Sequence, residues 1–146
     1  MLSYRHAFHA GNHADILKHL CLVGVLESMT KKDKNFTAID AHAGAGIYFL
    51  DDERAIKTGE SQVGILSLYQ KFLANKENSE IPNLVKNYLH FVEPYLKNNQ
   101  YPGSPEIIRK FLRSGDKEFL FELHNTEIEI LKSNIKDSRV TILHQN

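Results

Sequence analysis

The chain has 146 residues, 42% of them hydrophobic, and its 18 Lys and Arg residues balance its 18 Asp and Glu residues. This length and composition suit a single hydrophobic core, so we expect one domain or part of one. The zero formal net charge excludes a large, uniformly basic surface for nucleic acid, but it does not exclude a local basic patch. The only cysteine, Cys21, excludes an internal disulfide and a cysteine-rich zinc site, and its apolar neighbours predict a buried thiol.

The first 34 residues form the segment most suited to a polyanion, because five basic residues there outnumber three acidic ones and four histidines accompany them. No apolar run approaches the ~20 residues that a membrane helix needs, and the N-terminus lacks the apolar core of a signal peptide. We therefore expect a cytoplasmic protein with no membrane partner.

In chain order, hydrophobic spacing and turn residues predict alternating helices and strands. Asn12 is placed to cap a helix over residues 13–30, with Asp15 in the first turn, where a carboxylate suits the helix dipole. Residues 48–60 look irregular, and residues 74–79 read as a polar linker. Strands are expected at residues 36–41, 117–124 and 139–143, and further helices at 61–75, 81–91, 105–114 and 125–136.

Prolines set two of these boundaries. The helix at 81–91 should end before Pro94, because proline cannot continue the backbone hydrogen-bond ladder. The segment Tyr101-Pro-Gly-Ser-Pro105 predicts a rigid turn into the next helix, with Ser104 as its N-cap and Pro105 at its first helical position.

This order of elements predicts an α/β fold with a parallel sheet, in which ligands bind at the carboxyl ends of the strands. We expect residues 1–47 to form an N-terminal arm, a helix and the first strand with its loop. Residues 48–105 are expected to be a helical insertion, and residues 106–146 to continue the sheet domain.

A glycine loop follows the first expected strand and reads Asp40-Ala-His42-Ala-Gly44-Ala-Gly46. An acidic residue closing a strand, followed by glycines at every second position, is typical of loops that let a nucleotide-like ligand approach the backbone. The usual S-adenosylmethionine loop has a glycine where this chain has His42. A plain turn is the alternative interpretation of such a short Gly/Ala segment.

Glu122 lies near the end of the second expected strand. Its two carboxylate oxygens could accept both ribose hydroxyls of an adenosine cofactor. The separation from Asp40 is long for a simple dinucleotide unit, and the insertion at 48–105 accounts for the excess. The alternative is that Glu122 is only a solvated strand end.

Four histidines lie close together near the N-terminus, at positions 6, 9, 13 and 19. Only His9 and His13 have the i, i+4 spacing of a helical metal pair, and no strong third ligand accompanies them, so we expect no metal site. Together with Tyr4, Arg5 and Lys18, the histidines favour a polar patch that stacks on nucleotides and contacts phosphates. A solvated arm before an amphipathic helix is the alternative.

These motifs, in their order and spacing, resemble the RlmJ family of S-adenosylmethionine-dependent methyltransferases, which modify adenine N6 in 23S ribosomal RNA. The resemblance covers the whole chain and rests on the opening Met1–Asp15, Leu17-Lys-His19, the glycine loop, Thr58-Gly-Glu60, Tyr101–Pro105 and Glu122-Leu-His124. It implies a Rossmann-like methyltransferase fold whose insertion is a small helical subdomain that helps to hold RNA.

The resemblance also implies roles for individual residues. The expected contacts with the cofactor, S-adenosylmethionine, are His19, His42, Gly44, Gly46, Ser104 and Glu122. The residues expected beside the target adenosine are Tyr4, His6 and Lys18. The resemblance implies 23S ribosomal RNA as the partner, and we expect the protein to be a monomer.

One departure from the family pattern is important. Methyltransferases of this kind carry Asp/Asn-Pro-Pro-Tyr/Phe to position the target amine, whereas no two of the four prolines here are adjacent. The sequence therefore predicts the N-terminal half of a larger enzyme, with no catalytic residue in this chain. We expect the chain alone to be inactive and marginally stable, because a half-sheet leaves an edge and a face uncovered.

Two alternatives come from other classes of function. One is methylation of adenine in DNA, or a role in the use of external DNA, although a zero net charge argues against strong binding to duplexes. The other is a non-catalytic module that binds S-adenosylmethionine or a nucleotide.

Overall fold

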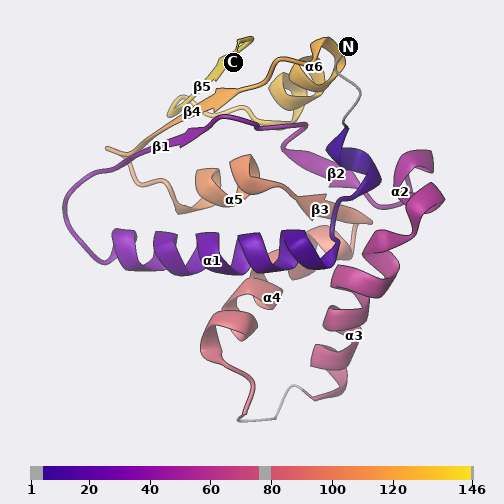
Figure 1. Cartoon of the computed structure of the whole chain (residues 1–146). Helices are drawn as coiled ribbons and strands as arrows, with labels where there is room; N and C mark the ends of the chain where they lie inside the picture. Colours follow the sequence, from indigo (N-terminus) through magenta and orange to yellow (C-terminus); the bar gives the residue numbers. More distant parts are fainter. Residues whose placement is uncertain (1–4, 76–79, 146) are drawn as a thin grey trace. The chain divides into compact units, whose positions relative to one another are not determined.

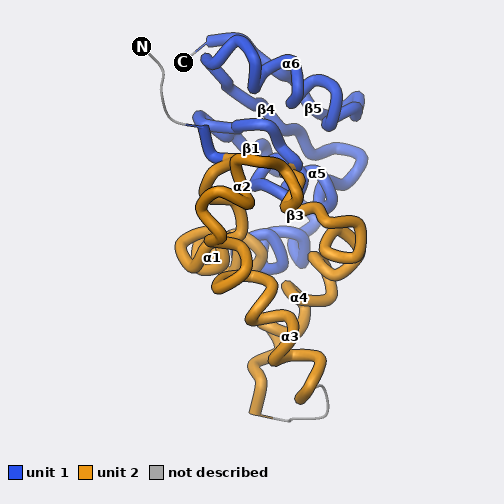
Figure 2. The backbone as a smooth tube through the Cα atoms, turned by 90° about the vertical axis from the view of Figure 1, so that its right-hand side faces the viewer, with its two compact units in different colours: residues 1–6, 25–47, 102–146 blue, residues 7–24, 48–101 orange. Residues whose placement is uncertain are grey.

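The computed structural model describes residues 5–75 and 80–145 (Figure 1). Within these ranges the chain divides into two compact units (Figure 2). Unit 1 comprises residues 5–6, 25–47 and 102–145, and unit 2 comprises residues 7–24, 48–75 and 80–101. Helix α1 (His13–Thr30) passes from unit 2 into unit 1 after Gly24.

Unit 1 is built on a parallel sheet. Among the described residues this sheet has three strands, in the order β1 (Thr37–Asp40), β4 (Lys117–Phe121) and β5 (Val140–Leu143). Both strand pairs are parallel, and the register places Ile39 opposite Phe119. The α/β fold with a parallel sheet that the sequence predicts is thereby confirmed, with each strand shorter than expected.

The core of unit 1 joins this sheet to helix α6 (Asn125–Asn134). Leu120 on β4 and Leu131 on α6 are fully buried, and Ala43 and Ile135 complete the cluster with them. Full burial of such a leucine is worth about 1.5–3 kcal/mol. Leu120 is the one residue of β4 in this cluster, and the other buried position of the strand is occupied by Glu118.

An ion pair fastens the strand ends opposite the glycine loop. The buried Asp116 carboxylate accepts hydrogen bonds from the Phe36 N–H at 2.9 Å and from the Arg113 side chain at 2.8 Å. The Arg113 guanidinium also donates to the backbone carbonyls of Lys32 and Lys34. The hydrogen bond from Arg113 lowers the pKa of Asp116 to about 2. One charge pair therefore orders the turn before β1 and the turn before β4.

Unit 2 is mostly helical. It contains the first part of α1 and a core of fully buried side chains that includes Ile65, Tyr88 and Tyr101. Its further elements are β2 (Ile47–Phe49), α2 (Glu53–Thr58), the π-helix η2 (Gln62–Leu66), α3 (Ser67–Ala74), α4 (Asn83–Leu96) and β3 (Gln100–Pro102). Strands β2 and β3 pair with each other, so the described part of the chain has a small second sheet that the sequence did not predict.

A close backbone contact joins the N-terminal loop to η2. The Ile65 N–H donates to the carbonyl oxygen of Gly11 at 2.9 Å, and a Cβ on Gly64 would lie 2.1 Å from that oxygen. Gly64 also departs from helical geometry, with φ −88° and ψ −112°. Only a residue without a side chain permits this approach.

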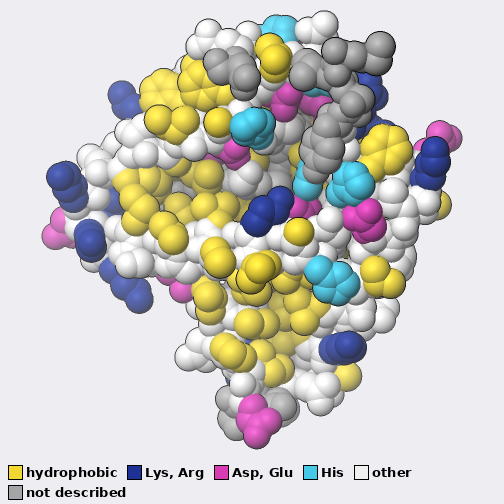
Figure 3. All heavy atoms as spheres, viewed as in Figure 1, with side chains coloured by type: hydrophobic (Ala, Val, Ile, Leu, Met, Phe, Trp, Pro, Cys, Tyr) yellow, Lys and Arg dark blue, Asp and Glu magenta, His cyan; other side chains and the backbone are white. Residues whose placement is uncertain are grey.

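Helix α1 carries an exposed apolar stripe. Leu17 is 65% exposed and Val25 is 54% exposed, and Cys21 and Met29 on the same side of the helix are exposed as well. Their spacing of four residues places them in one line about 18 Å long. Figure 3 shows hydrophobic side chains gathered along this helix. The buried thiol that we predicted for Cys21 is therefore wrong, because α1 is apolar on more than one side and Cys21 lies on an exposed one.

Two boundary predictions are also wrong. Helix α4 continues through Pro94 to Leu96, because a proline removes one N–H near the end of the helix and leaves the following turn intact. Residues 48–60 are not irregular, since β2 and α2 lie there.

Candidate cofactor site

The loop after β1 is held by Asp40. Its carboxylate accepts the N–H of His42 at 3.0 Å through Oδ1 and the hydroxyl of Ser104 at 2.5 Å through Oδ2. The Gly103 N–H donates to the Gly46 carbonyl at 2.8 Å, which adds a backbone link between the same two segments. The predicted cofactor residues His42 and Ser104 are thus brought together, although 62 positions separate them in the sequence.

The role predicted for Ser104 as an N-cap is wrong. Helix α5 (Ser104–Phe111) has Gly103 at its N-cap position, and no side chain caps it. The Ser104 hydroxyl is committed to Asp40 instead, so a contact across unit 1 has replaced a local one.

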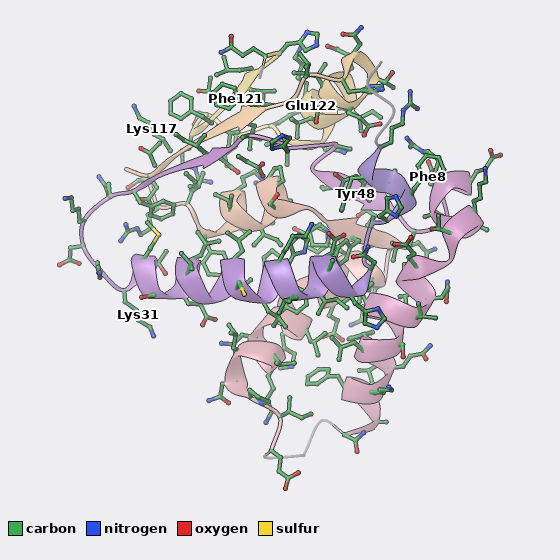
Figure 4. The ribbon with its side chains drawn as sticks, in the orientation of Figure 1. Phe8, Lys31, Tyr48, Lys117, Phe121 and Glu122 are labelled. Atoms are coloured by element: carbon green, nitrogen blue, oxygen red, sulfur yellow. The ribbon has the colours of Figure 1, made fainter. Side chains whose placement is uncertain are left out.

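Glu122 holds the same loop from the neighbouring strand. Its Oε2 accepts the Gly44 N–H at 2.8 Å, and its Oε1 accepts the His124 N–H at 2.7 Å. Figure 4 labels Glu122 beside Phe121, at the end where β4 finishes. A carboxylate has about four lone-pair positions, so Glu122 retains acceptor capacity on both oxygens after these two bonds. The Glu122 carboxylate is therefore hydrogen-bonded to the loop and is not merely a solvated strand end.

Glycine is needed at positions 44 and 46 of the loop for different physical reasons. Gly44 has φ +61° and donates its N–H to the Glu122 carboxylate, so its backbone is the part of the loop held by that carboxylate. Gly46 has φ +75°, and a Cβ there would lie 2.9 Å from a methyl carbon of Leu131. At Gly46 the missing side chain makes room for Leu131 of α6, so this glycine is required by the packing of the core.

His19 belongs to unit 2, whereas the other predicted cofactor residues belong to unit 1. Its side chain is almost fully buried, and its Nδ1 lies 2.9 Å from the Tyr101 hydroxyl. His19 is therefore not part of an exposed polar patch, as the clustering of N-terminal histidines had suggested.

The predicted substrate residues lie near the N-terminus, and Tyr4 is outside the described residues. Lys18 is mostly exposed, and its ammonium group pairs with the buried Asp15 carboxylate at 2.9 Å. Asn12 caps α1 as predicted, because its Oδ1 accepts the Asp15 N–H at 2.9 Å. His6 lies in the short helix η1 (His6–Phe8) and is partly exposed.

No role was predicted for Glu60, although the motif Thr58-Gly-Glu60 is part of the family resemblance. Glu60 accepts hydrogen bonds from Asn12 Nδ2 at 2.9 Å and pairs with His9 Nδ1 at 2.8 Å. The hydrogen bond from Asn12, followed by the one from His9, lowers the pKa of Glu60. Thr58 adds a hydrogen bond from its hydroxyl to the Phe8 carbonyl. The motif therefore fastens the segment that follows η1, and only its recurrence in the family could have indicated this.

A buried carboxyl near Asp40 was also missed. Glu118 on β4 is fully buried, and neither of its side-chain oxygens has a hydrogen-bond partner among the described residues. Burial first, and then the charge of Asp40, raise the pKa of Glu118 to about 8. Glu118 is therefore largely protonated at neutral pH. The sequence shows only an alternating strand at this point, so nothing marks this carboxyl as buried.

Within residues 5–75 and 80–145 no three His, Cys, Asp or Glu side chains are grouped so that they could hold a metal ion. None of the helices described is both long enough and apolar enough to cross a bilayer.

Fold and site together define the class of protein. A parallel sheet whose first strand leads into a glycine loop, held by an acid at the end of the neighbouring strand, is a Rossmann-like α/β arrangement. The RsmJ family model, described as Ribosomal RNA large subunit methyltransferase D, RlmJ, matches residues 33–146, and the chain belongs to this family.

Curated relatives agree with this assignment. The chain is 43% identical over 146 residues to Ribosomal RNA large subunit methyltransferase J of Escherichia coli, covering 97% of this chain and 50% of that protein. It is 38% identical over 151 residues to the protein of the same name from Haemophilus influenzae, covering 100% of this chain and 51% of that protein. The chain thus spans about half the length of the curated relatives it matches.

A solved structure agrees as well. The crystal structure of protein LPL1258 from Legionella pneumophila, assigned to family DUF519, has a TM-score of 0.75 and 32% sequence identity. The match covers 94% of this chain and 49% of that one.

Proposed function

We propose that this chain is the N-terminal half of an enzyme that transfers a methyl group from S-adenosylmethionine to N6 of an adenine in 23S ribosomal RNA. One observation carries the proposal: Asp40 and Glu122 gather His42, Gly44 and Ser104 at the carboxyl ends of neighbouring parallel strands. This is the edge of a parallel sheet at which nucleotide-like ligands bind. The names of the relatives support rRNA as the substrate.

The residues present suit this cofactor. Glu122 has lone pairs left for the two ribose hydroxyls, and its bond to Gly44 holds it at the loop. Asp40 accepts the backbone N–H of His42 and so orders this part of the loop, while the His42 side chain stays exposed. S-adenosylmethionine would supply an activated methyl group on a positively charged sulfur. The chain's own residues would bind and orient the adenosine and methionine parts.

The N-terminal segment is proposed to face the RNA. Lys18 places a positive charge at the surface, and the buried Asp15 restricts where that charge can lie. Glu60 and Thr58 fasten the backbone that follows His6. A phosphate contact by Lys18 and a stacking contact by His6 would then start from ordered positions, which reduces the entropy lost on binding.

The amine-positioning motif is not in this chain, so we propose that the chain binds cofactor but does not transfer methyl groups by itself. In the whole enzyme the neutral N6 amine would attack the methyl group in line, and positioning would supply most of the rate enhancement. The part of the cofactor pocket formed by this chain would contribute only orientation.

Binding of the cofactor is tested with the chain alone. Isothermal titration calorimetry with S-adenosylmethionine should detect binding to the wild type, and Glu122→Gln should weaken it about tenfold, since one charged acceptor is lost. Glu129→Gln is the matched control, because Glu129 lies on the exposed face of α6 and pairs only with the exposed Lys132 in the described structure. Equal affinities for the two variants would contradict the assigned role of Glu122.

Transfer is tested with the whole gene product. Labelled S-adenosylmethionine is incubated with protein-free 23S rRNA from cells lacking the gene, and with genomic DNA in parallel. Label in adenine N6 of the RNA supports the proposal, and label only in DNA moves the function to DNA modification. Label incorporated by the 146-residue chain alone would refute the proposed division of roles.

A further inference from the structure

The amino ends of the three strands of unit 1 form an edge that gathers positive charge. Three segments make up this amino edge: residues 31–36 before β1, residues 109–117 up to the start of β4, and residues 135–139 before β5. They contain nine basic and three acidic residues, a formal charge of +6, whereas the whole chain has a formal charge of zero. The rest of the chain is acidic by the same amount, so the two signs of charge are unevenly distributed.

Hydrogen bonds join the three segments into one surface. The Lys117 N–H donates to the Phe36 carbonyl at 3.1 Å, and the Glu118 N–H donates to the Arg139 carbonyl at 3.0 Å. The Arg139 guanidinium also donates to the Leu112 carbonyl. Neighbouring strands lie about 4.8 Å apart, so the three strand entries fall within about 10 Å of one another. All these residues belong to unit 1, so the edge is defined within one unit.

The three arginines of the amino edge are used within the fold. Arg113 binds the buried Asp116 carboxylate at 2.8 Å, and Arg139 binds the Asp137 carboxylate at 2.5 Å. Arg109 lies 3.7 Å from the same Asp137 carboxylate. Two of the three acidic residues of the edge are therefore paired with arginine and do not offset the charge of the lysines.

The six lysines of the amino edge differ from the arginines, because all of them are exposed. They are Lys31, Lys32, Lys34, Lys110, Lys117 and Lys136. The lysine ion pairs found within the described residues involve Lys18, Lys97 and Lys132 instead. Figure 3 shows Lys and Arg side chains along the left-hand margin, the side on which Figure 4 labels Lys31 and Lys117.

The backbone beneath these lysines is ordered. The Arg113 guanidinium donates to the Lys34 carbonyl at 2.9 Å and also to the Lys32 carbonyl, so the loop before β1 is fixed to the turn before β4. Like charges held together repel one another, so gathering six lysines at one edge costs stability. A polyanion that neutralises them would remove this cost and release counterions.

Helix ends explain only part of this pattern. Lysines suit the C-terminal end of a helix, where the helix dipole is negative, and α1 ends at Thr30 and α5 at Phe111. That effect accounts for Lys31 and Lys110. It does not account for Lys117, which opens a strand.

We propose that the amino edge binds the phosphate backbone of 23S ribosomal RNA, outside the segment that contains the target adenine. The inference rests on the proposed function, because that function supplies RNA as the polyanion. Strand β4 has five residues and spans about 16 Å, so the amino edge and the candidate cofactor site lie at opposite ends of the same strands. Phosphate contacts fix position without reading sequence, so the edge would orient the RNA and leave the choice of adenine to other residues.

The salt dependence of RNA binding tests this surface. The affinity of the chain for protein-free 23S rRNA is measured by filter binding between about 50 and 200 mM salt. The glutamine variant combines Lys34→Gln, Lys117→Gln and Lys136→Gln, one lysine from each segment. Each lost phosphate contact lowers the slope of log K against log salt by about 0.7–0.9. The slope should therefore fall by about 2, and the affinity at about 100 mM salt should fall at least about tenfold.

An arginine variant at the same three positions is the matched control. Lys34→Arg, Lys117→Arg and Lys136→Arg keep the charge, so this variant should keep the slope of the wild type. Equal slopes for the wild type and the glutamine variant would overturn the inference. An equal loss in both variants would overturn it too, because that result would not depend on charge. A wild-type chain that does not bind the rRNA at about 50 mM salt would also overturn it.

The whole gene product separates this inference from the proposed function. In the glutamine variant the KM for rRNA should rise, while kcat and the affinity for S-adenosylmethionine should stay unchanged. A gene product that methylates no RNA, but whose RNA binding still depends on these lysines, would refute the proposed function and support the surface. Methylation of RNA with the same KM in the glutamine variant and the wild type would refute the surface alone.

Discussion

Replacing Asp116 with asparagine tests whether one buried charge pair holds the start of the sheet. The pKa of Asp116 falls from 3.8 to about 2, chiefly through the hydrogen bond from Arg113. At ~1.36 kcal/mol for each pKa unit, the ionised carboxylate stabilises the fold by about 2 kcal/mol. Asparagine keeps the shape and one acceptor oxygen, but it loses the charge. We therefore expect Asp116→Asn to lower the free energy of unfolding at pH 7 by about 2 kcal/mol.

The dependence on pH has a defined sign. Because the folded-state pKa is below the unfolded value, the stabilisation is fully present above about pH 4 and is lost as the pH falls through about 2. Urea denaturation followed by circular dichroism should show the wild type and Asp116→Asn converging over that range. Asp51→Asn, at an exposed position, is the control and should match the wild type throughout. A gap below about 0.5 kcal/mol at pH 7, or a gap that does not change with pH, would refute the reasoning.

Two further predictions concern the loop and the buried carboxyl. Gly46→Ala should destabilise the fold by about 2–4 kcal/mol, because it combines positive φ with a collision against Leu131. Gly59→Ala shares the positive φ but meets no atom within 4 Å, so it should lose only about 1–2 kcal/mol in the same urea titration, and equal losses would refute the packing argument. Glu118→Gln should equal the wild type near pH 4.5 and exceed its free energy of unfolding by about 4 kcal/mol near pH 8, because the folded-state pKa is raised and wild-type stability falls between these values. If the free energies of unfolding of the wild type and Glu118→Gln changed in parallel with pH, the raised pKa of Glu118 would be contradicted.

Local sequence signals predicted the elements that depend on local chemistry. The cap at Asn12 and the periodic apolar residues after it predicted α1 with its observed bounds. The three parallel strands were also predicted, because each is a short apolar run bounded by turn residues. The glycine loop after Asp40 predicted where the strand ends, whereas binding of a ligand at this loop stays a prediction.

Contacts between distant segments could not be predicted from local patterns. The hydroxyl of Ser104 is bound by Asp40, 64 positions away, and not by its own helix. Glu60 fastens the segment at Asn12 from 48 positions away, and Glu118 is buried by elements that lie far from it in the sequence. Each of these pairings depends on the tertiary fold, so a single sequence offers no periodicity that would indicate it.

The exposed stripe on α1 has a practical chemical consequence. Cys21 is the only thiol of the chain and lies within that stripe, between Leu17 and Val25. A thiol-reactive fluorophore would therefore attach at one known place without any mutation. Its emission would report whether that face of the helix becomes shielded from water. The same accessibility means that air oxidation can join two chains through a single covalent bond, so samples for measuring oligomeric state need a reductant.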